Sequence, residues 1–390
     1  MATNNLRQNT WSLNAWYEQD YAGDVSYSGT GAAYAWGRNN YGQLGLNQSN
    51  TSHKSSPVQI PGNWATIRAG SSNNFGVKSD GTLWAWGRND QGQLGHNNKT
   101  HYSSPVQIPG TTWSKDRLKI SNIGVFNSYA IKTDATLWSW GYGTNGRLGQ
   151  NSNTNYSSPR QVPGTTWNIV SSSYNGQFAI KTDGTLWSWG WNNNGGYGGL
   201  LGHNNKTNYS SPRQVGSDTD WDFVTVSADS GSIFAHKTDG TLWSWGYNGS
   251  GQLGIGNKTA YSSPKQVPGS TWSGASAAIA GASSAGFAIR TDGTLWGWGA
   301  GQEGQLAQNN LTEYSSPRQI PGTTWSKVTS RGTSVFAMKT DGTAWAWGKN
   351  NYGQLGVNNE TKYSSPVQIP GTAWDIIEGG NDHTIGRQIH

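Results

Sequence analysis

Short apolar runs, separated by turns rich in glycine, asparagine and serine, recur along the whole chain. In one such run Trp84 and Trp86 fall on one face of an extended strand, while Leu83 and Ala85 fall on the other. Both faces are therefore apolar, as in a sheet that is covered on both sides. No helical period accompanies these runs, so the pattern predicts an all-β protein.

A Trp-Gly step ends one apolar run in every repeat and recurs at intervals of about fifty residues. The seven tryptophans of this step are Trp36, Trp86, Trp140, Trp189, Trp245, Trp298 and Trp347. A sheet of this size cannot bury two apolar faces alone, so copies of it are expected to stack around an axis. The repeat therefore predicts a β-propeller.

Each repeat is expected to form four short strands bounded by turn residues. In one repeat these strands cover residues 167–171, 178–182 and 185–189, and the fourth follows Pro212. An Asp-Gly pair joins the second strand to the third as a tight hairpin, because glycine adopts a positive φ at low cost. Ala135 replaces this glycine in one repeat, so we expect a locally different turn there.

The two ends of the repeat array are expected to complete one blade together. The first repeat begins at its third strand, residues 32–36, and the chain finishes with residues 374–378 and 383–388, which look like a first and a second strand. Pairing them would close the ring and remove the free sheet edges that promote aggregation. The sequence thus predicts a seven-bladed β-propeller of four-stranded blades over residues 29–390, after a non-repeat leader at residues 1–28.

The repeat reads FAIKTDGTLWSWG, continues with GQLG at residues 251–254 in one copy, and ends on SSPxQV, where x varies. Over residues 30–388 this wording resembles the repeat of the regulator of chromosome condensation family. The resemblance implies a seven-bladed propeller, in agreement with the strand pattern. It implies less about function, because one propeller fold serves many unrelated activities.

The best-known member of that family is a nucleotide exchange factor for a small nuclear GTPase and also binds chromatin, using a projecting wedge and a basic amino-terminal tail. This sequence has no comparable insertion, and its leader carries one basic residue, Arg7. The Gly-Trp-Arg-His-Thr motif of a related plant ultraviolet receptor is absent as well. The Asn-Gly spacers and SSPxQ segments instead resemble versions of the repeat found in bacterial surface proteins and bacteriophages.

Composition narrows the classes of protein further. The 390 residues include no cysteine and only 12% charged residues. No apolar run approaches the length of about eighteen residues that suggests a membrane-spanning helix, and the first ten residues lack the pattern of a secretory signal. The net charge of +6 comes from scattered basic residues, so we do not expect a nucleic-acid partner.

No group of residues that departs from the repeat suggests catalysis. The few glutamates show no acid–base spacing, and the sequence contains no P-loop, GxSxG or HExxH motif. His96 and His203 share one loop position in two repeats, but a metal site there would need ligands from separate blades. We therefore expect a protein that is not an enzyme and has no catalytic, cofactor-binding or metal-binding residues.

The loops between the third and fourth strands are the longest, and all should project from one face of the propeller. The residue after each Trp-Gly step begins such a loop and varies between repeats, and variable positions on a uniform ring are where specificity can reside. These positions are Arg38, Arg88, Tyr142, Trp191, Tyr247, Ala300 and Lys349. Apart from Ala300, we take them as candidate binding residues.

Two other rings of repeated residues are interpreted as scaffold. A tyrosine precedes Ser-Ser-Pro in six repeats, as at Tyr209, and packing at the loop base is favoured over a sugar- or protein-binding role. A Lys or Arg precedes Asp by two residues in six hairpins, as at Lys181 and Asp183. We interpret these pairs as neighbouring opposite charges that keep the rim soluble.

The leader contains large aromatic residues, which implies that it docks on something. Its candidate attachment residues are Trp11, Trp16, Tyr17 and Tyr21. Two alternatives stay open: the leader caps this propeller, or it attaches the propeller to another subunit.

Our leading hypothesis is a non-enzymatic bacteriophage virion component, associated with a tail or fibre and made in the cytoplasm of a bacterial host. Its partners would be other virion proteins and a cell-surface glycan or protein of the host, with no insertion into a membrane. The alternative is a cytoplasmic protein-interaction propeller, such as a small-GTPase exchange factor or a chromatin-binding protein.

Overall fold

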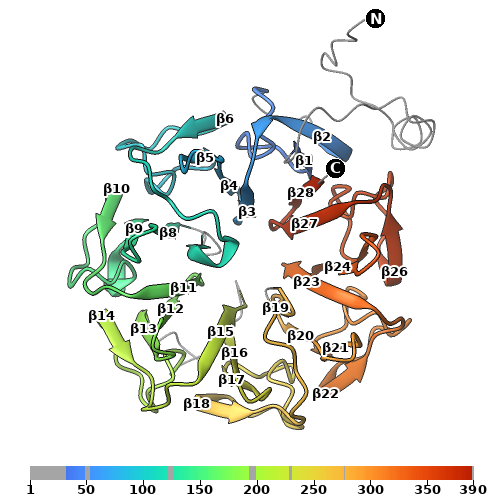
Figure 1. Ribbon diagram of the computed structural model, residues 1–390. Helices are drawn as coiled ribbons and strands as arrows, with labels where there is room; N and C mark the ends of the chain where they lie inside the picture. The colour runs from blue at the N-terminus through green and yellow to red at the C-terminus, as the bar shows by residue number, and fades with distance from the viewer. Residues whose placement is uncertain are drawn as a thin grey trace, which may run out of the picture.

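Seven four-stranded antiparallel sheets stand in a ring around an axis (Figure 1). This computed structural model describes residues 32–48, 53–121, 126–192, 199–227, 231–275 and 277–388. In these ranges the only helical segments are two short 3₁₀ turns, η1 (Arg117–Lys119) and η2 (Thr144–Gly146), and no helix has the length and apolar character to cross a membrane. The predicted all-β propeller with seven blades is confirmed.

The strands of each blade follow one another from the axis outward, as Figure 1 shows. The innermost strands are β3 (Thr66–Ala69), β7 (Ile120–Ser121), β11 (Trp167–Ser172), β15 (Trp221–Val226), β19 (Ile279–Gly281), β23 (Trp325–Arg331) and β27 (Trp374–Gly379). The second strands are β4 (Asn73–Val77), β8 (Asn127–Ile131), β12 (Gly176–Lys181), β16 (Ser232–Lys237), β20 (Ala285–Ile289), β24 (Ser334–Lys339) and β28 (His383–Gln388).

The third strands are β1 (Ala32–Gly37), β5 (Leu83–Gly87), β9 (Leu137–Gly141), β13 (Leu186–Gly190), β17 (Leu242–Gly246), β21 (Leu295–Gly299) and β25 (Ala344–Gly348). The outermost strands are β2 (Lys54–Asn63), β6 (Tyr102–Gln107), β10 (Tyr156–Gln161), β14 (Tyr209–Gln214), β18 (Tyr261–Gln266), β22 (Tyr314–Gln319) and β26 (Tyr363–Ile369). The outer strand β14 begins three residues before Pro212, earlier than expected, because an edge strand tolerates proline.

Both ends of the chain contribute to one blade, whose strand order is β2-β1-β28-β27. Strand β1 pairs with β28 along its whole length, from Ala32 opposite Gln388 to Gly37 opposite His383. The predicted composite blade is therefore confirmed. It leaves the ring closed by strand pairing and side-chain packing between segments far apart in the sequence.

The hydrophobic core lies between blades rather than within them. One buried cluster joins Phe75 and Leu83 of one blade to Trp113 and Trp140 of the next. Each of the other clusters likewise combines residues of two neighbouring blades. Every sheet is therefore covered on both sides by its neighbours. This arrangement explains why both faces of the third strand are apolar.

A hydrogen bond from each Trp-Gly tryptophan crosses to the preceding blade. Trp86 Nε1 donates to the carbonyl oxygen of Gln43, at 3.0 Å, in the loop that corresponds to GQLG. The equivalent donors are Trp36, Trp140, Trp189, Trp245, Trp298 and Trp347. The repeated tryptophan therefore fixes the position of each long loop as well as filling the core.

The Asp-Gly hairpins have the expected geometry, but the prediction for Ala135 is wrong. Ala135 has φ 62° and its N–H donates to the Lys132 carbonyl at 3.0 Å, as the Gly81 N–H does to Lys78 at 3.0 Å. A left-handed alanine costs only about 1–2 kcal/mol. Asp134 offsets this cost by accepting from the backbone N–H and the hydroxyl of Thr136, at 3.0 and 2.6 Å.

Candidate partner-binding face

One face of the ring carries the loops between third and fourth strands together with the turns between first and second strands, and we call it the long-loop face. The residue after each Trp-Gly step lies where these two sets of loops meet. The Arg88 N–H donates to the carbonyl of Ser72 at 2.9 Å, and the Arg38 N–H donates to that of Asp382 at 2.8 Å. The corresponding bonds join Tyr142 to Phe126, Trp191 to Asn175, Tyr247 to Gly231, Ala300 to Ser284 and Lys349 to Thr333.

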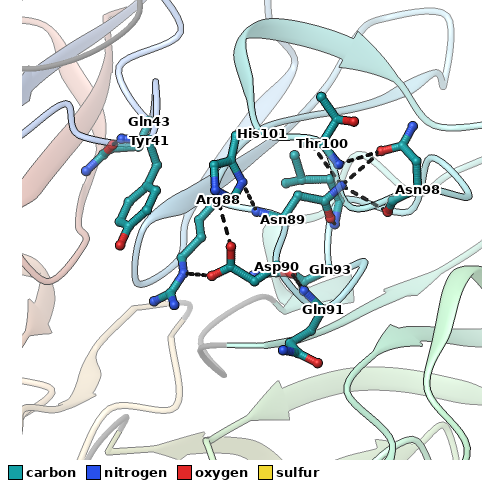
Figure 2. Close-up of polar contacts among 11 residues, drawn as sticks. Tyr41, Gln43, Arg88, Asn89, Asp90, Gln91, Gln93, Asn98, Thr100 and His101 are labelled. Atoms are coloured by element: carbon teal, nitrogen blue, oxygen red, sulfur yellow. Dashed lines mark hydrogen bonds and ion pairs between the residues drawn. The ribbon is translucent and has the colours of Figure 1, made fainter.

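A buried asparagine supports the long loop that follows Arg88 (Figure 2). Asn89 is fully buried; its side-chain oxygen accepts from the Leu94 N–H at 2.9 Å, and its amide donates to the Thr100 carbonyl at 2.9 Å. Its own N–H donates to Nδ1 of His101 at 3.0 Å. Asn248 and Asn350 make matching contacts in other blades. The loop is thus held by hydrogen bonds, so the side chains it presents have fixed positions.

Arg88 is the centre of a network of charged and aromatic side chains at this loop (Figure 2). Its Nε forms an ion pair with Asp90, whose other oxygen lies 3.2 Å from Nε2 of His101. Its guanidinium lies 5.1 Å from the ring centroid of Tyr41 and 5.0 Å from that of Phe126. These are cation–π distances, so Arg88 connects aromatic residues of neighbouring blades.

Arg147 forms a second network of this kind. Its guanidinium lies 5.2 Å from the ring of Tyr142, 5.1 Å from Tyr174 and 5.0 Å from Trp191. Its Nε donates to the Tyr174 carbonyl at 2.8 Å, and burial lowers the pKa of the guanidinium. Phe126 makes edge contacts with both Tyr142 and Tyr174, so the two arginine networks are continuous. We call this continuous group the arginine–aromatic arc.

A third group lies on the composite blade, where two candidate residues share one carboxylate. Asp382 lies 3.2 Å from Nη1 of Arg38 and 3.1 Å from Nζ of Lys349. The Arg38 guanidinium also lies 5.4 Å from the ring of Tyr352. Together with the arc, these contacts give the long-loop face an alternation of cations and aromatic rings.

The structure brings five of the six candidate binding residues into these groups. Tyr247 occupies the matching position of its blade, and Ala300 is 2% exposed. Arg147 and Asp382 are functional candidates that the repeat pattern did not predict. The sequence did offer a signal for Arg147, because this arginine replaces the glutamine in one copy of GQLG. It offered none for Asp382, because its partners Arg38 and Lys349 lie far away in the sequence.

The opposite face carries the Asp-Gly hairpins and the Pro-Gly turns, and we call it the hairpin face. The charged side chains of these hairpins are neighbours, as expected, and each also has a second partner. Lys181 Nζ lies 4.3 Å from the ring centroid of Trp187, and Asp183 accepts from the hydroxyl of Thr185 at 2.6 Å. Equivalent contacts place Lys78, Lys132, Lys237, Arg290 and Lys339 over tryptophans. The basic ring is therefore part of the scaffold.

The other scaffold interpretations agree with the geometry. Tyr102 packs against its core cluster, and its hydroxyl accepts from Asn98 Nδ2 at 2.9 Å. His96 contacts the Val106 carbonyl at 3.1 Å, and His203 contacts the Ser188 hydroxyl at 2.9 Å. Among the described residues, no group of three His, Asp or Glu side chains is placed to hold a metal ion. The aromatic leader residues Trp11, Trp16, Tyr17 and Tyr21 lie outside the described residues, so their attachment role stays a prediction.

The composite blade, the fifty-residue repeat and the tryptophan bonds between blades define a repeat-built β-propeller. The chain belongs to the regulator of chromosome condensation (RCC1) repeat family, whose model matches residues 30–77, 80–120, 134–177, 239–286, 292–334 and 341–386. The unmatched residues between 177 and 239 nevertheless contain strands of two regular blades.

Relatives with curated functions are distant and mostly longer. The chain is 25% identical to human E3 ubiquitin-protein ligase HERC2 over 84% of its own length but only 7% of that protein. It is 26% identical to the Arabidopsis thaliana ultraviolet-B receptor UVR8 over 55% of its length and 48% of that protein. The chain thus spans less than half of each of these relatives.

Solved structures support the fold. Human WBSCR16 aligns with a TM-score of 0.78 at 19% identity, covering 92% of this chain and 98% of that one. Prp20p from Saccharomyces cerevisiae aligns with a TM-score of 0.79 at 19% identity, covering 95% and 94%. At this identity the likeness establishes the propeller and not the function.

Proposed function

We propose that this protein is a non-enzymatic propeller that binds a protein partner through the long-loop face. The observation that carries the proposal is the arginine–aromatic arc. Aromatic residues and arginine are enriched at protein interfaces, where they act as binding anchors. Within the arc, Arg88, Tyr142 and Trp191 occupy variable positions of an otherwise uniform ring, while Arg147 is buried beneath the aromatic rings that it contacts.

The family comparison favours a protein as the partner. Prp20p was described together with its binding to Gsp1p and histones. UVR8 and HERC2 are a receptor and a ubiquitin ligase, but the match leaves about half of one and most of the other uncovered. We therefore carry over protein binding and not ligase or receptor activity.

The cellular setting is a separate proposal. The repeat wording and the polar, weakly charged composition favour a bacteriophage virion, with the long-loop face meeting a virion protein or the host surface. The family relatives favour the alternative, a protein-interaction propeller, and give no support to either location. The identity of the partner distinguishes these settings.

Site-specific photo-crosslinking tests the proposal. A photoreactive amino acid replaces half-buried Tyr41 on the long-loop face, and a matched variant carries it at exposed Thr165 on the hairpin face. We expect the position 41 variant to form a specific protein adduct in a lysate of the source cells, while the position 165 variant does not. Adducts from position 165 alone, or from neither position, would contradict the proposal.

Nucleotide exchange is the narrower activity to measure. If the adduct contains a small GTPase, release of a fluorescent nucleotide should be faster with the propeller than without it. If the adduct contains a virion protein, the virion setting is supported and exchange activity is not expected.

A further inference from the structure

A cavity is lined by residues of six innermost strands, the strands that surround the propeller axis in Figure 1. Its volume is about 80 Å³, several times the 10–15 Å³ needed for about one water molecule. Residues of β3, β11, β15, β19, β23 and β27 line it, together with Arg117 and Leu118 of η1. Side chains therefore leave room on the axis for a small ligand.

Two arginines and one glutamate form a buried group in the wall of this cavity. Glu378 Oε1 lies 2.7 Å from Arg68 Nη1 and 2.5 Å from Arg117 Nη2, and Oε2 accepts from the Ala69 N–H at 3.3 Å. Burial opposes ionisation of Glu378, but the two guanidinium groups hold the pKa of this carboxyl below its ordinary value. One carboxylate is thus shared by two cations.

A third cation lines the same cavity and leaves the wall with an excess of positive charge. The ionisable lining residues are Arg68, Arg117, Arg331 and Glu378. Arg331 is 2% exposed, and its Nε donates to Asn381 Oδ1 at 3.0 Å. The lining residues thus carry three guanidinium groups and one carboxylate, largely shielded from water, a condition that favours an added anion.

The wall also holds polar atoms that suit an anion. Within the described ranges, Arg68 Nε, Arg117 Nε and Ser330 Oγ are buried without a hydrogen-bond partner. Buried donors of this kind destabilise a protein unless an acceptor satisfies them. Thr225 lines the same space, whereas the hydroxyl of Thr329, another lining residue, already donates to the Ile377 carbonyl at 2.7 Å.

We propose that the axial cavity binds a compact oxyanion, a phosphate or carboxylate group, next to Arg331 and the Arg68–Glu378–Arg117 group. Guanidinium groups present forked donors that match the oxygens of these anions. The cavity is too small for a polymer to pass through, so the ligand is a small molecule or the end of a larger one.

Isothermal titration of the full chain with inorganic phosphate and, separately, with acetate tests the proposal at constant ionic strength. We expect saturable binding of at least one probe and a rise in melting temperature with its concentration, because a ligand that binds the folded state stabilises it. Saturation by phosphate alone assigns a phosphate site, and saturation by acetate alone assigns a carboxylate site. No saturable binding of either probe would overturn the proposal.

Charge variants locate the site. Arg331→Gln removes one cation and should weaken binding about tenfold, while Glu378→Gln removes the competing carboxylate and should strengthen it about tenfold. Arg160→Gln, on the outer strand β10, is the matched control and should leave the affinity unchanged. If Arg331→Gln does not fold, the Glu378→Gln variant decides. Unchanged affinity in the folded cavity variants, or an equal loss in the control, would overturn the assignment.

Discussion

At the scale of single residues, the close approach of each long loop to the tryptophan of the next blade explains the last glycine of GQLG. Gly95 has φ +80°, and a Cβ there would lie 2.9 Å from Trp140 Nε1. Gly45, Gly149, Gly254 and Gly356 face tryptophans in the same way. Ala307 occupies this position in one blade with φ 54°.

Gly95→Ala should therefore lower the free energy of unfolding by about 2–3 kcal/mol, combining the left-handed conformation with displacement of Trp140. Gly216→Ala is the control, because Gly216 has φ +65° with nothing within 4 Å of its added Cβ. It should cost only about 1–2 kcal/mol. Equal losses in urea unfolding would show that Trp140 does not constrain the loop.

A buried histidine makes stability sensitive to acid. His383 is 1% exposed, and burial lowers its pKa from 6.5 to about 3. The unfolded chain therefore binds the proton more readily between these values, so stability is full above pH 6.5 and falls as the pH drops toward 3. The slope from this residue reaches about 1.4 kcal/mol per pH unit.

His383→Gln should flatten that slope. Unfolding free energies of the variant and the wild-type protein, measured at several pH values between 4 and 7, give the difference in slope. The comparison cancels the contribution of His203, whose pKa burial lowers to about 4. Parallel curves for the two proteins would mean that His383 accepts a proton as readily in the folded state as in the unfolded state, which would contradict the lowered pKa.

At the scale of elements, the hairpin between second and third strands depends on a threonine as much as on its Asp-Gly pair. The Thr185 hydroxyl donates to Asp183 at 2.6 Å and accepts from Trp187 Nε1 at 2.8 Å. The repeat wording predicted the turn but not this link to the tryptophan. The prediction of a different turn at Ala135 was also wrong. Alanine disfavours a positive φ only modestly, and the hydrogen bonds of Asp134 with Thr136 hold the same turn.

Thr185→Val should destabilise the protein by about 1–2 kcal/mol, because the shape is kept while two hydrogen bonds are lost. Thr207→Val, at an exposed loop position, should change stability by less than about 0.5 kcal/mol. Chemical denaturation followed by tryptophan fluorescence measures both. A loss at Thr185 no larger than that at Thr207 would contradict the role assigned to its hydroxyl.

At the scale of the whole molecule, the sequence predicts most of the fold and only part of the site. The missing first strands of repeat one and the surplus strands at the chain end predicted the composite blade. Variation after Trp-Gly predicted the ring positions, including Arg88 and Lys349. Arg147 carried a signal, its replacement of glutamine in GQLG, but its aromatic partners come from other loops, which the repeat period does not reveal. Asp382 carried no signal, because its partners Arg38 and Lys349 lie far away in the sequence.

Closure of the ring makes the whole propeller dependent on β28. A chain that ends at Gly380 leaves β1 with an unpaired edge and should aggregate or lose its cooperative thermal transition. A chain that ends at Gln388 keeps every paired residue of β28 and is the control. Light scattering and calorimetry distinguish them; a monomeric, cooperatively folded chain ending at Gly380 would show that closure is dispensable.

The central claim is that the arginine–aromatic arc binds the partner, and the most direct test is the affinity of the crosslinked partner for arc variants. Titration calorimetry would compare the wild-type protein with Arg88→Gln and with the outer-strand control Arg160→Gln. Similar melting temperatures of the three proteins would show that both variants are folded. If the proposal holds, we expect at least about tenfold weaker binding, ~1.4 kcal/mol, for Arg88→Gln and no change for Arg160→Gln. Unchanged affinity in Arg88→Gln would contradict it.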